Sequence, residues 1–137
     1  MKNQRTISKF LKSVLILFVL ITIQSVFTSA TVTINIDVSP NVLNLENQGE
    51  VVTVHTDIAY GLVVGSTVYL NEVPIKSWKS DDRGNFVAKF YMEDVKDLPL
   101  NIGEMNTLTM VGVLIDGSTF TGSQQIKVIE VIPAGKK

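Results

Sequence analysis

Residues 107–132, TLTMVGVLIDGSTFTGSQQIKVIEVI, decide the class of fold because they read as a β-hairpin. Apolar residues dominate 107–115 and recur through about 123–132, and each segment has the length of a strand. Asp116-Gly117 lies between the two segments. This dipeptide favours the positive φ values of a tight hairpin turn, so we expect antiparallel β-structure at this end of the chain.

Closer to the N-terminus, short segments of alternating apolar and polar residues predict more strands. They cover residues 31–38, 42–45, 50–58, 67–70, 73–75 and 86–92, with a polar turn at 81–85 and room for one helical turn within 93–100. We expect Val52 and Val54 to face inward, and Val87 to lie on the opposite side of its strand from Phe86. About seven short strands and no long helix predict an all-β fold, a single antiparallel β-sandwich.

The first 30 residues have the pattern of a signal peptide. Residues 1–12 are basic, 13–27 are apolar, and Thr28-Ser29-Ala30 ends the stretch with small residues. An uncleaved anchor is the alternative, because no charge interrupts residues 13–36 and a spanning helix needs about 20 apolar residues. Either way we expect a secreted or extracytoplasmic protein associated with the cell surface, which contacts the membrane only through residues 13–30 if the leader is uncleaved. Residues 133–137 are expected to form a flexible tail.

The composition excludes several classes of function. The chain of 137 residues contains no cysteine, so disulfide frameworks, thiolate zinc sites and cysteine nucleophiles are ruled out. After residue 30 there are 8 Lys and Arg against 13 Asp and Glu, a net charge of −5. Because an acidic domain of this kind lacks the basic face that nucleic acid requires, no nucleic-acid partner is expected.

Residues 108–130 carry a resemblance to a known family. They follow the approximate pattern L-T-x-x-G-x-L-x-D-G-x-x-F-x-G-S, with Asp116-Gly117 at the turn and Phe120, Gly122 and Ser123 after it. This segment resembles the closing hairpin of an immunoglobulin-like β-sandwich accessory module of secreted and surface proteins of archaea and bacteria. Residues 36–45 and 66–71 are similar to earlier segments of that module. The resemblance implies one Ig-like domain over residues 31–132 and an extracellular setting, but no particular activity.

Some members of that family carry an acidic loop that resembles a calcium site. At the corresponding place only Asp81, Asp82 and Asn85 offer oxygen ligands, and Arg83 lies among them. Calcium takes about six to eight oxygen ligands, so these residues predict at best a weak calcium site. The alternative is a polar hairpin turn with Gly84 in the left-handed conformation.

Three aromatic residues are candidates for binding a ligand. Trp78, Tyr69 and Tyr91 predict a platform for carbohydrate if they lie together, because flat rings stack on the faces of sugars. The alternative is structural, since a single Trp in a β-sandwich is more often part of the core or a cap over it.

Apolar residues on both sides of the strand at 107–115 supply a candidate interface. Its second side is formed by Val111 and Val113 and continues on the closing strand as Ile129 and Val131. We expect one of two arrangements. Either a loop such as 93–100 covers these residues, or they form a contact patch for a second copy or another partner.

No catalytic pattern stands out in the sequence. His55 is the only histidine, it is expected on the outer face of a strand beside Asp57, and no Gly-x-Ser-x-Gly segment accompanies it. We therefore expect no enzyme and no cofactor. The expected function is that of a non-catalytic exported or cell-surface module with a structural, adhesive or protein-interaction role, whose partner is an envelope protein or a second copy. The alternative is an extracellular carbohydrate-binding or weak calcium-binding module.

Overall fold

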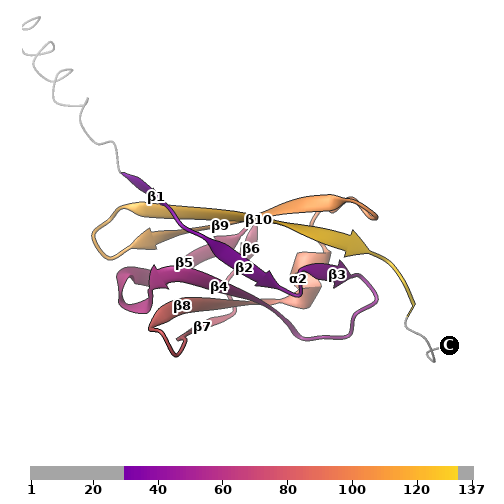
Figure 1. Ribbon diagram of the computed structural model, residues 1–137, viewed down its shortest axis with the longest axis horizontal. Helices are drawn as coiled ribbons and strands as arrows, with labels where there is room; N and C mark the ends of the chain where they lie inside the picture. Colours follow the sequence, from indigo (N-terminus) through magenta and orange to yellow (C-terminus); the bar gives the residue numbers. More distant parts are fainter. Residues whose placement is uncertain (1–29, 133–137) are drawn as a thin grey trace, which may run out of the picture.

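Residues 30–132, the part of the chain that the computed structural model describes, form two β-sheets packed face to face (Figure 1). The predicted leader, apart from Ala30, and the predicted tail at 133–137 lie outside these residues. The elements in chain order are β1 (Thr31–Thr33), β2 (Ile36–Ser39), β3 (Val42–Asn44), β4 (Val51–Ala59), the short 3-10 helix η1 (Tyr60–Leu62), β5 (Val63–Leu70), β6 (Val73–Pro74), β7 (Ser77–Ser80), β8 (Asn85–Tyr91), α2 (Met92–Lys96), β9 (Met105–Leu114) and β10 (Thr119–Ile129).

The sheet topology is that of an immunoglobulin-like sandwich. Sheet A has the strand order β1-β10-β9-β5-β6, with β3 also paired to β10, and sheet B has the order β2-β4-β8-β7. The three long strands β10-β9-β5 thus lie against β4-β8-β7, as in the two sheets of the Ig fold. The predicted all-β sandwich is confirmed, and β9 and β10 form the predicted hairpin with Gly117 at a φ of 86°.

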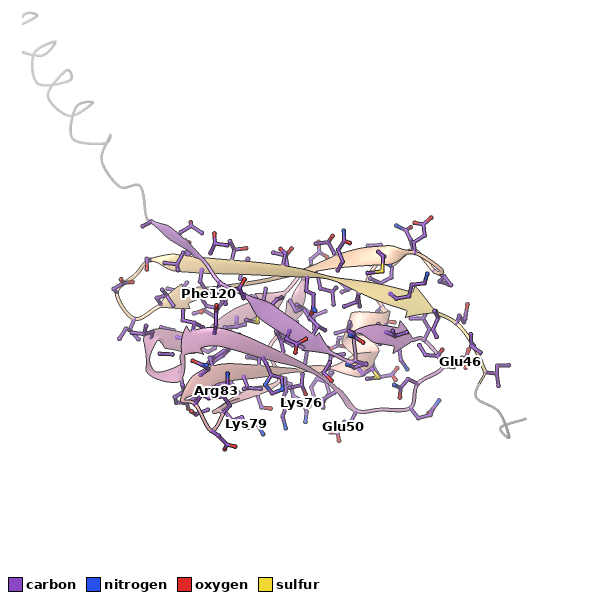
Figure 2. The ribbon with its side chains drawn as sticks, in the orientation of Figure 1. Glu46, Glu50, Lys76, Lys79, Arg83 and Phe120 are labelled. Atoms are coloured by element: carbon purple, nitrogen blue, oxygen red, sulfur yellow. The ribbon has the colours of Figure 1, made fainter. Side chains whose placement is uncertain are left out.

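The core lies between the two sheets. Its largest fully buried side chains include Phe86, Phe90 and Phe120, and Figure 2 shows Phe120 between the layers. Burying each of these rings stabilises the fold by about 1.5–3 kcal/mol. Gly112 makes room for one of them, because a Cβ at Gly112 would lie 2.6 Å from the Phe120 ring. The predicted inward residues of β4, Val52 and Val54, are buried in this core.

The strand predicted at residues 31–38 is divided between the two sheets. β1 pairs in parallel with β10, whereas β2 pairs antiparallel with β4. Asn35 lies at the crossing, where its backbone N–H and its side-chain amide donate to the Asp57 carboxylate at 3.0 and 2.8 Å. Alternation shows which side of a strand is buried, but it does not show which sheet supplies the pairing partner.

Three further details differ from the sequence predictions. β5 begins at Val63, and its pairing with β9 is interrupted by a bulge between Val64 and Tyr69. β7 was not predicted at all. Val87 lies on the opposite side of β8 from the core residue Phe86, as predicted, but it is fully buried there.

The only α-helix among residues 30–132 is α2, and it falls where one helical turn was predicted. It contacts β8 and β4. Within the described residues, no helix combines the length and hydrophobicity needed to cross a membrane.

Candidate functional site

The outer side of sheet A carries an array of uncharged side chains. In the strands that build it, the outward positions are occupied mainly by threonine and valine, and only Lys127, at the far end of β10, is charged. We call the part of this surface between the row of Thr107 and the row of Val113 the uncharged face, which leaves out Met105, Lys127 and Ile129 at the other end of β9 and β10. It consists of Thr31, Thr33, Val64, Tyr69, Thr107, Thr109, Val111, Val113, Thr119, Thr121, Ser123 and Gln125.

The strand register brings residues that are distant in sequence into rows across this face. Val111 lies opposite Thr121 of β10 on one side and opposite Tyr69 of β5 on the other. In the next row Val113 lies between Thr119 and Val64. The parallel pairing of β1 with β10 adds a threonine to the end of each row. The result is a continuous surface over four strands, which only the register could reveal.

The uncharged face has a hollow beside an exposed ring. A shallow depression of about 330 Å³ is lined by Thr31, Thr67, Val111, Gly112, Val113, Thr119, Phe120 and Thr121. Tyr69, in the row of Val111, is 44% exposed, and Val111 itself is 40% exposed. The face therefore combines an exposed aromatic side chain with a hollow that begins at its cross-strand neighbour Val111.

The predicted interface residues divide into two groups. Val111 and Val113 belong to the uncharged face, and the expectation that the segment at 93–100 covers them is wrong, because Val111 remains exposed and α2 contacts the other sheet. Ile129 follows Thr121 by eight residues along β10, about 27 Å in an extended strand. Val131 lies beyond the end of that strand. The structure therefore does not bring Ile129 and Val131 into the same patch.

The outer side of sheet B is charged, in contrast to the uncharged face. Its register places Asp37, His55 and Lys79 in one row and Lys89 in the next. Figure 2 shows Lys79, with other charged side chains, along this layer of the sandwich. The two outer surfaces of the same domain thus differ in electrostatic character.

The three predicted aromatic ligand-binding residues lie on different surfaces. Trp78 pairs with the buried Ala88 and lies over Gly65 of the opposite sheet, where a Cβ would be 2.2 Å from its ring. Tyr69 is on the outer side of sheet A. Tyr91 is exposed at the end of β8, with the Lys76 ammonium 5.1 Å from its ring centroid. The structure therefore does not assemble the three rings into one platform.

The predicted calcium ligands lie in the turn between β7 and β8. One carboxylate oxygen of Asp81, Oδ1, accepts the backbone N–H groups of Arg83 and Asn85 at 2.8 and 2.9 Å. The bond from Asn85 is the main cause that lowers the pKa of Asp81. Gly84 has a φ of 81°, as expected for a polar hairpin turn. Among residues 30–132, no three His, Asp or Glu side chains are grouped closely enough to hold a metal ion.

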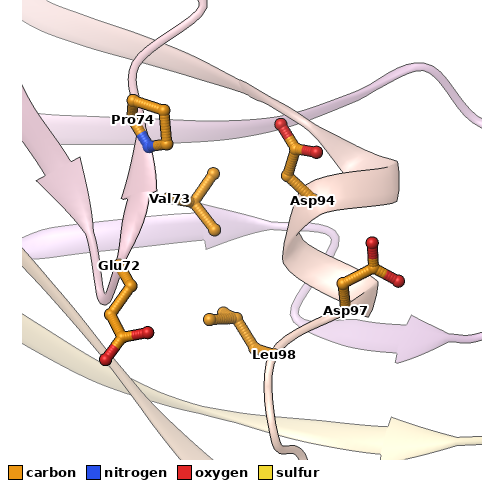
Figure 3. A pocket seen from close by; sticks show the side chains of 6 residues that line it. All are labelled: Glu72, Val73, Pro74, Asp94, Asp97 and Leu98. Carbon is orange, nitrogen blue, oxygen red and sulfur yellow. The ribbon is translucent and has the colours of Figure 1, made fainter.

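A second hollow has an acidic rim that the sequence did not indicate. It lies between the turn after β5 and α2, and it is lined by Glu72, Val73, Pro74, Asp94, Asp97 and Leu98 (Figure 3). The three carboxylates come from segments separated by more than 20 residues. Only the tertiary fold places them around one hollow, which is why no sequence motif marks it.

The histidine shows no catalytic arrangement with its acidic neighbour. His55 and Asp57 both lie on the outer side of β4, but the two Asp57 oxygens accept bonds from Asn35. The Asn35 backbone bond is the main cause that lowers the pKa of Asp57.

No protein-family model, curated protein or solved structure matches the chain significantly.

Proposed function

We propose that this protein is a non-catalytic exported or cell-surface Ig-like module that acts through protein contacts made by its uncharged face. The observation that carries the proposal is the uncharged face itself. On a domain with a net charge of −5 after residue 30, one outer surface bears no acidic residue over four rows of side chains.

The composition of the face is that of a protein contact surface. Interface centres are depleted of charged residues and enriched in aromatic side chains, and exposed tyrosine is a frequent anchor. Tyr69 and Val111 supply an exposed apolar centre, and threonines surround it. Because β9 and β10 are long paired strands, the face is rigid and can bind without a large ordering cost.

The other proposed role, binding of carbohydrate or weak binding of calcium, has less support. Trp78, Tyr69 and Tyr91 lie on separate surfaces. Asp81 Oδ1 already accepts two backbone bonds, and no group of three acidic or histidine side chains lies close enough together among residues 30–132 to hold a metal ion. The proposed export rests on the basic, apolar and small-residue pattern of residues 1–30.

Site-directed photo-crosslinking in living cells tests the proposed contact surface. A benzophenone amino acid replaces Val111 in the full chain, and the matched control carries it at His55 on the outer side of sheet B. We expect protein adducts from position 111 at a yield several-fold above that from position 55. Equal yields at both positions, or no adduct at 111, would contradict the proposal.

A further inference from the structure

We propose that the partner of the uncharged face is a second copy of this chain, docked face to face about a twofold axis that passes near Val111. The inference rests on the proposed function and specifies its partner. In such an isologous contact the same patch is used by both copies, so the patch must be complementary to itself. Three observations support this requirement: charge, shape and the state of the hydroxyl groups.

The charge distribution favours this face for contact with a second copy, because an equally acidic partner meets no carboxylate here. All 13 Asp and Glu residues lie outside the uncharged face, in the loops, in α2, at the strand ends and on sheet B. Two copies that approach through the loops, α2 or the strand ends bring carboxylates together, and like charges that face each other are destabilising. On the outer side of sheet B they would also bring Lys79 and Lys89 together. A basic partner would instead gain most at the acidic surfaces. The uncharged face is thus the surface that suits another copy of the same acidic chain.

The shape of the face is compatible with self-docking. Tyr69 lies in the same row as Val111, and the depression of about 330 Å³ begins at Val111 and extends toward Val113 and Thr119. A twofold axis that lies in the interface near Val111 and runs parallel to β9 would place Tyr69 of each copy opposite Thr121 of the other, which lines the depression. Each ring then gains apolar burial without any change in the backbone of either copy.

Several hydroxyl groups of the face already have partners inside their own chain. The Oγ1 atoms of Thr31 and Thr119 lie 3.0 Å apart, and Thr109 Oγ1 lies 2.7 Å from Ser123 Oγ. In the hollow of the face, the Thr67 hydroxyl donates to the Val64 carbonyl and accepts the Val113 N–H. An unpaired polar group costs about 1–3 kcal/mol on burial, so these internal bonds reduce the cost of covering the face with an uncharged surface.

The size of the face sets the expected strength of the contact. Four strands spaced about 4.8 Å apart, over about 20 Å of strand length, cover roughly 400 Å² per copy. Stable complexes bury about 800 Å² per partner. The dimer is therefore expected to dissociate readily in dilute solution and to form where copies are concentrated.

Cysteine cross-linking tests the dimer because the natural chain contains no cysteine. The full chain carrying Val111→Cys is treated in intact cells with a short bis-maleimide, and His55→Cys is the matched control. We expect a product of twice the chain mass from Val111→Cys at a yield several-fold above the control. Adding Tyr69→Ala to Val111→Cys should lower that yield by about ten-fold, as expected for loss of a central anchor. Circular dichroism of each variant confirms that the β-structure is retained.

The outcomes separate the two proposals. No dimer from Val111→Cys, together with benzophenone adducts at position 111 that contain a different protein, would overturn self-association and leave the proposed contact function standing. No dimer and no adduct would overturn both. Equal dimer yields from Val111→Cys and His55→Cys would also overturn the inference, because random collision would then explain the products.

Discussion

At the bulge in β5, one side chain replaces regular strand pairing. The Thr67 hydroxyl accepts the backbone N–H of Val113 at 2.9 Å and donates to the carbonyl of Val64 at 2.6 Å. It therefore connects β5 to β9 in the stretch where the register shifts between Val64 and Tyr69. This single hydroxyl helps to hold the part of the uncharged face that contains Val113.

Replacing this hydroxyl tests its role. Thr67→Val keeps the shape of the side chain and leaves the Val113 N–H without its partner, so we expect the free energy of unfolding to fall by about 1–3 kcal/mol. The matched control is Thr121→Val on the same face, which we expect to change stability by no more than about 0.5 kcal/mol. Urea denaturation followed by Trp78 fluorescence measures both values. Equal losses in the two variants would contradict the assigned role.

At the scale of elements, β7 is held against the opposite sheet by one close contact. Trp78 of β7 lies over Gly65 of β5, and a Cβ on Gly65 would be 2.2 Å from the ring. The contact closes one side of the sandwich, because β7 is the edge strand of sheet B. The tryptophan thus acts as a cap over the core, which was the structural alternative considered from the sequence.

Gly65→Ala should displace the Trp78 ring and destabilise the domain by about 1–3 kcal/mol, the range typical of overpacking. Gly61→Ala is the matched control, because nothing lies within 4 Å of a Cβ at that position. We expect the Trp78 emission maximum to move to longer wavelength in Gly65→Ala and to stay unchanged in Gly61→Ala. An unchanged emission maximum in both variants would show that the ring is not held by this contact.

Local patterns predict some elements and not others. The alternation in β4 identified Val52 and Val54 as inward residues, and Asp116-Gly117 identified the hairpin turn, because both signals depend on neighbouring residues. The division of residues 31–38 between two sheets depends instead on pairing with distant strands. The candidate site follows the same rule. Val111 and Tyr69 were each named from the sequence, but in two different candidate sites. That they are neighbours could not be predicted, because their pairing is set by the register of β5 on β9.

At the scale of the whole molecule, three aspartates accept hydrogen bonds that stabilise the segments connecting strands in different parts of the fold. Asp57 holds Asn35, where the chain crosses from β1 to β2, Asp81 closes the turn between β7 and β8, and Asp116 accepts bonds from Ser118 in the turn between β9 and β10. The pKa of each carboxyl is lowered from its ordinary value of 3.8, in Asp116 mainly by the Ser118 side chain. All three are therefore more readily ionised in the folded chain than in the unfolded chain.

These shifts predict a loss of stability in acid. A carboxyl with a lowered pKa in the folded state stabilises the fold fully above its unfolded-state pKa, and the contribution disappears as the pH falls through the lowered folded-state pKa. The contribution of these three carboxylates to the free energy of unfolding should therefore be constant near neutral pH and fall as the pH drops below about 4.

The triple variant with Asp57→Asn, Asp81→Asn and Asp116→Asn keeps an acceptor oxygen at each position but cannot titrate there. Urea denaturation between neutral pH and pH 3 should show a smaller acid-induced loss in the variant than in the natural chain, because the variant lacks these three ionisations. Parallel losses in the two proteins would mean that other groups determine the acid sensitivity of the fold.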